Sequence, residues 1–194
     1  MTKWGVLVVA FTLWPACKGN DASTAKPCQP SNPEQCQEAC EKGNMPSCTS
    51  LGILHKNSKA YEKAFPLFEK ACNKNDMRGC DELAAAYMLG HSVAVDRKRA
   101  MDLFAKACNG FAPACTNLGA MHCEDEDHKK GHALFEKACT GGDFMGCSNL
   151  GSHYLQGQGV PQDLERAREL YEKACNGGDA KGCESLKHLR QQGL

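Results

Sequence analysis

Apolar residues recur along this chain at helical spacing, in blocks that resemble one another. Four blocks read FPLFEKAC, MDLFAKAC, HALFEKAC and RELYEKAC, where a Leu-aromatic pair lies one turn before an Ala-Cys pair. Other blocks, LGILH, LAAAYMLG, LGAMH and LGSHYLQG, carry apolar residues at i, i+3 and i+4. Such spacing gathers apolar side chains on one face of a helix. The pattern predicts an all-α chain of paired amphipathic helices.

Cysteine spacing defines the repeat. Alanine precedes the first cysteine of every pair, a small residue precedes the second, and leucine follows the second by three positions. The pairs are Cys40/Cys48, Cys72/Cys80, Cys108/Cys115, Cys139/Cys147 and Cys175/Cys183. Helical hairpins of this size bury their apolar faces by stacking on their neighbours. We therefore expect an α-solenoid of about five helix-turn-helix repeats, at about 32–57, 58–95, 96–126, 127–162 and 163–194.

Aspartates and glycines mark the ends of these helices. The glycine pairs in CTGGDFMGC and CNGGDAKGC can leave a first helix in the left-handed conformation. Asp76, Asp143 and Asp179 are placed to cap second helices, and Asp96 and Asp163 to cap first helices.

The start of the chain predicts export. Lys3 is followed by the apolar run Trp4–Trp14, which is too short to span a bilayer but suits a signal peptide. Pro15-Ala16-Cys17 is similar to a bacterial lipobox, so residues 1–17 are interpreted as a signal peptide and Cys17 as a lipidation site, with plain secretion as the alternative. Residues 18–31 then form a flexible tether. Lys18 favours the periplasmic face of the outer membrane.

Composition agrees with this compartment. The chain has 14 cysteines in 194 residues, a number that an oxidising compartment explains as disulfides. Lys+Arg and Asp+Glu are both 23, so the chain lacks the excess of positive charge that binding to nucleic-acid phosphates requires. A nucleic acid is therefore not predicted as a partner.

The repeats share the pattern A-x-x-L-F-E-K-A-C…G-C-x-x-L-G-x-x-Y-x-x-G-x-G-V-x-x-D. This pattern resembles the Sel-like repeat, a relative of the tetratricopeptide repeat. The paired cysteines make it similar to the exported cysteine-rich branch typified by the Helicobacter cysteine-rich proteins. The resemblance covers residues 32–194 and implies a right-handed superhelix whose hairpins each carry one disulfide. The implied disulfides are Cys40–Cys48, Cys72–Cys80, Cys108–Cys115, Cys139–Cys147 and Cys175–Cys183. Closing each short loop should stabilise its hairpin by roughly 2.5 kcal/mol.

Four cysteines lie outside this pattern. Cys17 has the lipid role given above, and Cys28 can pair with Cys36 in a sixth disulfide. Cys123 then has no partner. Together with His128 and His132, which share a helix face, it is a candidate metal ligand. The favoured interpretation is structural, a shortened loop whose acidic run caps the next helix, and no cofactor is predicted.

No convincing active site appears. Members of the cysteine-rich family have been named β-lactamases or penicillin binders, yet the single S-x-x-K string, Ser23 to Lys26, lies in the tether. We therefore predict a non-catalytic scaffold in the bacterial cell envelope that binds a protein or peptide on the solenoid surface and the membrane through its N-terminal lipid. The alternatives are a hydrolase of the β-lactamase or penicillin-binding type, and a metal or redox chaperone or assembly factor.

Overall fold

A computed structural model describes residues 28–29 and 32–193, and every regular element in them is an α-helix. The helices form five hairpins, one within each expected range. They are α1 (Pro33–Glu41) with α2 (Met45–Asn57), α3 (Tyr61–Asn73) with α4 (Met77–Leu89), α5 (Arg97–Ala107) with α6 (Ala112–Glu124), α7 (His128–Thr140) with α8 (Phe144–Gln156), and α9 (Leu164–Asn176) with α10 (Ala180–Gln191).

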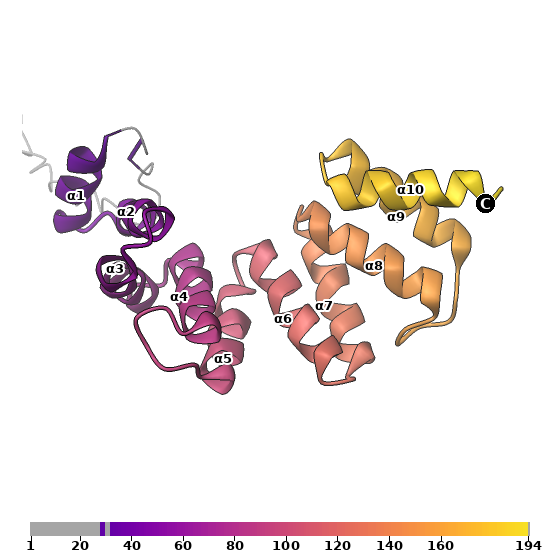
Figure 1. Cartoon of the computed structure of the whole chain (residues 1–194), viewed down its shortest axis with the longest axis horizontal. Helices are drawn as coiled ribbons and strands as arrows, with labels where there is room; N and C mark the ends of the chain where they lie inside the picture. Colours follow the sequence, from indigo (N-terminus) through magenta and orange to yellow (C-terminus); the bar gives the residue numbers. More distant parts are fainter. Residues whose placement is uncertain (1–27, 30–31, 194) are drawn as a thin grey trace, which may run out of the picture.

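The hairpins follow one another in a row and form an open arch, with α1 at one end and α10 at the other (Figure 1). Each second helix packs on the first helix of the next hairpin, as α2 does on α3 and α8 on α9. Second helices also touch across hairpins, in the pairs α2–α4, α6–α8 and α8–α10. The predicted α-solenoid is thus confirmed.

In the second to fifth hairpins, one buried aromatic side chain forms the core between neighbours. Phe68, Phe104, Phe135 and Tyr171 lie on α3, α5, α7 and α9 and are almost fully buried. Three of them meet a glycine of the preceding second helix. A Cβ on Gly52, Gly119 or Gly151 would lie 2.5, 2.8 or 3.0 Å from the facing ring. The glycine of the repeated Leu-Gly motif is therefore there to admit the aromatic ring.

Disulfides join the two helices of each hairpin at the turn. The pairs are Cys40–Cys48, Cys72–Cys80, Cys108–Cys115, Cys139–Cys147 and Cys175–Cys183, and a sixth disulfide joins Cys28 to Cys36. Cα atoms of the five hairpin pairs are 4.4 to 4.6 Å apart. A Cβ on Gly79, Gly146 or Gly182 would lie 2.6 to 2.7 Å from the Cβ of the alanine before the first cysteine. The small residues beside each cysteine let the two helices come this close.

Most predicted helix caps are present. The side chains of Asp96, Asp143, Asp163 and Asp179 each accept a hydrogen bond from a backbone N–H in the first turn of the helix that follows. The prediction for Asp76 is wrong, because its side chain makes no such bond. Its carboxylate instead accepts a hydrogen bond from Thr49 Oγ1 at 2.7 Å, which links the first two hairpins.

A lysine links most hairpins to the one before. The ammonium groups of Lys70, Lys106 and Lys173 donate to the carbonyl oxygens of Cys40, Cys72 and Cys139, at 3.0, 2.8 and 3.2 Å. These carbonyls belong to the C-terminal ends of first helices, where the helix dipole favours a positive charge. At the fourth hairpin Lys137 donates instead to Asn109 Oδ1 at 3.2 Å. The lysine of the repeated E-K-A-C motif is thus a contact between hairpins.

A hydroxyl and an aspartate form the second polar link. The pattern of Thr49 with Asp76 recurs as Thr116 with Asp143 and as Ser148 with Asp179.

The junction between the second and third hairpins differs from the others. Asp81 occupies the hydroxyl position and Phe111 the aspartate position. Asp81 Oδ1 accepts a hydrogen bond from Asn117 Nδ2 at 2.9 Å. Burial nevertheless raises the pKa of Asp81 to about 6. Ionised Asp81 therefore weakens this junction at neutral pH.

We expect Asp81→Asn to stabilise the protein above pH 6. The folded state binds the Asp81 proton more tightly than the unfolded state, so stability falls as pH rises from about 4 through 6. The amide removes that loss, and the free energy of unfolding at pH 7.5 should rise by about 1–3 kcal/mol. Denaturant titrations at pH 4.5 and 7.5 measure it. Asp102→Asn, at an exposed position of α5, is the control; an equal change in both variants would contradict the assignment.

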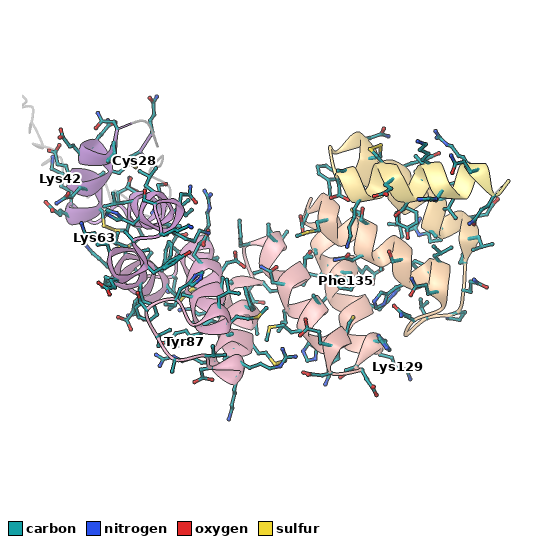
Figure 2. The ribbon with its side chains drawn as sticks, in the orientation of Figure 1. Cys28, Lys42, Lys63, Tyr87, Lys129 and Phe135 are labelled. Carbon is teal, nitrogen blue, oxygen red and sulfur yellow. A yellow bond between two sulfur atoms is a disulfide. The ribbon has the colours of Figure 1, made fainter. Side chains whose placement is uncertain are left out.

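We expect Lys106→Met to lower the free energy of unfolding by about 1 kcal/mol, because the change removes a charged hydrogen bond to the Cys72 carbonyl and keeps most of the aliphatic stem. Denaturant unfolding with the disulfides intact measures the loss. Lys63→Met is the matched control, at an exposed position on α3 (Figure 2). A loss as large in the control would show that the contact between hairpins contributes nothing of its own.

Candidate functional site

A cysteine and two histidines meet where the third and fourth hairpins stack. Cys123 lies in the last turn of α6, His128 begins α7, and His153 lies on α8. Cys123 Sγ is 3.4 Å from His153 Nε2. One side-chain ligand atom from each of these three residues lies within 4.8 Å of the other two. Among the described cysteines, Cys123 alone carries a free thiol. We call these three residues the Cys-His cluster.

Glycine makes room for the sulfur. A Cβ on Gly131 would lie 2.2 Å from Cys123 Sγ and 3.6 Å from His153 Cε1. The corresponding position holds alanine in the neighbouring first helices, at Ala64, Ala100 and Ala167. The thiol therefore occupies space that a methyl group fills elsewhere in the solenoid.

The imidazole of His153 is buried, and only one of its two nitrogens has a partner. Its exposed fraction is 3%, and its Nδ1 atom has no hydrogen-bond partner. The Nδ1 atoms of His128 and His132 are likewise buried and unpartnered. Phe135, labelled in Figure 2, packs edge-on against the His153 ring with centroids 5.1 Å apart. His153 thus has a buried nitrogen without a hydrogen-bond partner, which costs free energy.

Burial shifts the titration of Cys123, His132 and His153 toward their neutral forms. Burial, and then the nearby His132, hold the pKa of His153 below its ordinary value. Burial likewise lowers the pKa of His132. Burial, and then Asp127, raise the pKa of the Cys123 thiol. The lowered pKa values of His153 and His132 favour the neutral imidazole, in which a ring nitrogen can accept a proton or bind a metal.

The structure changes the set of residues expected from the sequence. Cys123 and His128 come together as expected. His132 lies nearby, with its ring 5.8 Å from that of His153 and 5.1 Å from that of Tyr154, but it is not in the group of three. His153 takes its place.

The sequence did carry a signal for His153. Six positions after the second cysteine the other hairpins have apolar residues: Leu54, Ala86, Met121 and Leu189. A histidine at a position that is apolar in the other repeats is the sequence feature that indicates the Cys-His cluster.

A second candidate site is an apolar groove on the edge of the arch that holds the hairpin turns. It has a volume of about 540 Å³ and spans the first three hairpins. Met45, Met77 and Phe111 give it an apolar lining, and Lys74 and Arg78 stand beside them. We call it the turn-edge groove.

The same edge continues past this groove. Phe144 and Met145 begin α8 and are 37% and 44% exposed. A Cβ on Gly177 would lie 2.2 Å from the Phe144 ring, so the turn of the fifth hairpin lies against this side chain.

Comparison with known families identifies the fold. Residues 48–76, 78–110, 112–143 and 145–179 match the Sel1 repeat. The chain therefore belongs to the Sel1 repeat family, and its resemblance to the Sel-like repeat is confirmed. Each matched unit begins in or next to the second helix of one hairpin and ends with the first helix of the next, because a stack of hairpins has no unique starting point.

Among curated proteins, cytochrome c oxidase assembly factor 7 of Xenopus tropicalis is 31% identical over 137 residues. That alignment covers 62% of this chain and 59% of the assembly factor. The chain thus spans little more than half of the length of this relative.

Two solved structures are reported as similar to this chain. A protective antigen of uropathogenic Escherichia coli strains, displaying an SLR fold, is 30% identical with a TM-score of 0.74 and covers 82% of this chain and 36% of its own. The cysteine-rich protein B of Helicobacter pylori is 27% identical with a TM-score of 0.33, over 79% of this chain and 90% of its own. Among the described helices, none has the length and apolar character needed to cross a membrane.

Proposed function

We propose that this chain is a non-catalytic scaffold that binds an extended segment of a partner protein in the turn-edge groove. The observation that carries the proposal is the apolar lining of that groove by Met45, Met77 and Phe111, which come from three successive hairpins. Sel1 repeat proteins bind proteins, and stacked hairpins present extended surfaces suited to that purpose.

The groove also indicates what kind of segment it takes. Methionine side chains adapt to apolar groups of different shape. Lys74 and Arg78 place positive charge beside them, which favours an acidic side chain in the partner. We therefore propose a partner segment with apolar side chains next to carboxylates.

Export and anchoring belong to the same proposal. The apolar run at residues 4–14 and the lipobox-like Pro15-Ala16-Cys17 support a lipoprotein of the cell envelope, held at the periplasmic face of the outer membrane. Cys17 and the tether up to residue 27 lie outside the described residues. Six disulfides agree with an oxidising compartment.

The alternative of a hydrolase rests on Ser23 and Lys26, which also lie outside the described residues. The Sel1 repeat is generally a binding scaffold, and this favours binding over catalysis. The name of the Xenopus relative describes assembly, a task that scaffolds perform by binding, and it supports the same choice.

Crosslinking within cells tests the groove. A photoreactive benzoylphenylalanine replaces Arg78, which is exposed at the groove, or Lys98, which is exposed at the opposite edge of the arch. We expect one dominant crosslinked protein from position 78, reduced at least about tenfold by adding Met77→Glu, because a buried carboxylate opposes an apolar contact. Val95→Glu, 66% exposed at the opposite edge, is the control and should leave the crosslink unchanged. Equal crosslinking from both positions would refute the groove as the binding site.

The anchor has a separate test. We expect the mature protein extracted from membranes to begin at Cys17 and to carry a lipid on that residue, as measured by intact mass. Cys17→Ser should leave the chain unlipidated and release it from the membrane fraction, because the lipid supplies the membrane affinity. A membrane-extracted chain that retains residues 1–16 would refute both processing and lipidation.

A further inference from the structure

We propose that Cys123, His128 and His153 bind one zinc ion at the junction of the third and fourth hairpins, with the fourth coordination position open to water or to a group from a partner. This site is independent of the turn-edge groove and stands whether or not that groove binds a protein.

The distances fit a tetrahedral ion. Bond lengths of about 2.3 Å to sulfur and about 2.0–2.1 Å to nitrogen, at the tetrahedral angle, put the two ligand atoms about 3.5 Å apart. Cys123 Sγ and His153 Nε2 are 3.4 Å apart. A ligand atom of His128 lies within 4.8 Å of both, so a small movement of its side chain completes three protein ligands. A thiol–imidazole hydrogen bond alone would account for the first pair but not for the approach of His128.

Three residues that differ from the repeat pattern lie together at this site, which supports a specific metal-binding function. Cys123 stands where the second and fourth hairpins have Met88 and Leu155. Gly131 stands where three other hairpins have alanine, and a methyl group there would overlap the sulfur. His153 is the buried polar residue at a position that is apolar in the other hairpins. These changes come from three different helices and meet at one point.

The cluster contains a buried imidazole with one nitrogen facing a thiol sulfur. His153 is only 3% exposed. Its Nε2 atom faces the Cys123 sulfur, and its Nδ1 atom has no hydrogen-bond partner. His128 Nδ1 is buried and unpartnered as well. Buried polar groups without partners are rare in folded proteins because they lose their hydration. A zinc ion bound through His153 Nε2 replaces the weak thiol contact with a coordinate bond, and Nδ1 then takes a separate partner, as the second nitrogen of a metal-bound histidine usually does.

Zinc suits this donor set. A thiolate and two imidazoles are typical zinc ligands, and carboxylate-preferring ions such as magnesium and calcium are excluded by the absence of oxygen donors from the group of three. On binding, the Cys123 thiol releases its proton to solvent and its sulfur forms the bond to zinc, without any change of oxidation state. The metal then joins α6, α7 and α8, so zinc should stabilise the folded chain.

The test uses the purified chain with its disulfides intact, freed of metal by a chelator and titrated with zinc in competition with a chromophoric chelator. Cobalt(II) is the spectroscopic probe, since thiolate ligation gives it an intense near-ultraviolet charge-transfer band. We expect one zinc per chain, a rise in Tm on zinc addition, and a cobalt spectrum that shows one thiolate ligand.

Variants separate ligation from packing. Cys123→Ser and His153→Leu should each weaken zinc binding at least about 100-fold, because a three-ligand site loses one ligand. His153→Leu restores the residue found at Leu54 and Leu189, so the fold is expected to tolerate it. Gly131→Ala restores the alanine of the other hairpins without touching a ligand, and should weaken binding about tenfold by displacing the sulfur. Far-ultraviolet circular dichroism checks that each variant is folded.

His132→Asn is the matched control, since His132 is a neighbouring histidine with an unpartnered Nδ1 that lies outside the group of three. It should keep zinc affinity within about fivefold. A loss in His132→Asn as large as that in His153→Leu would overturn the three-ligand assignment. Absence of stoichiometric zinc in the wild type, or zinc retained in both Cys123→Ser and His153→Leu, would overturn the site itself.

Discussion

Every hairpin of this solenoid depends on how closely two helix ends can approach at its turn. A disulfide between cysteines seven or eight residues apart in sequence holds the last turn of one helix against the first turn of the next. At Gly79, Gly146 and Gly182 even one methyl group would collide with the facing alanine. Sterics therefore restrict the position before the second cysteine to small residues, with glycine in three hairpins and Ser47 or Ala114 in the other two. A hairpin fixed in this way needs little core of its own, which suits units that bury apolar surface only against neighbours.

With the turn fixed, contacts between hairpins decide the shape of the arch. An aromatic ring against a glycine supplies the apolar contact, as in Phe68 with Gly52. Two hydrogen bonds supply the polar contacts: a lysine donates to a carbonyl at a helix end, and a Thr or Ser hydroxyl donates to an aspartate. The junction at Asp81 and Phe111 lacks the hydroxyl–aspartate link, and an aspartate whose burial raises its pKa to about 6 stands there instead. The polar contacts between the second and third hairpins therefore differ from those at the other junctions, with Asn117 donating to Asp81 in place of a hydroxyl donating to an aspartate.

The sequence predicted the fold well because the fold is periodic. Five copies repeat the same cysteine, alanine and leucine positions, so an error in one copy is corrected by the others. The ranges of the five repeats followed from this repetition, and the family resemblance implied one disulfide in each hairpin. The hydrogen bond of Asp76 did not, because its partner, Thr49, lies 27 residues earlier in the chain and no local rule relates the two.

The Cys-His cluster was predicted only in part for the same reason. Cys123 and His128 are near in sequence, and the structure places them together, whereas the helical spacing of His132 suggested it as a third member. His153 comes from the next helix of the stack, and only its place in the repeat distinguishes it from a surface histidine. Differences among the copies carry the specific chemistry, whereas the shared residues carry the architecture.

The lysine contacts also give the solenoid a direction. In each case the acceptor carbonyl belongs to the earlier hairpin and the ammonium group to the later one, as with Cys72 and Lys106. A chain that emerges from its N-terminus, during synthesis or translocation, would complete each acceptor before its donor arrives. Every new hairpin would then pack on a preceding hairpin that has already folded and is closed by its own disulfide. The arch would assemble from its N-terminal end.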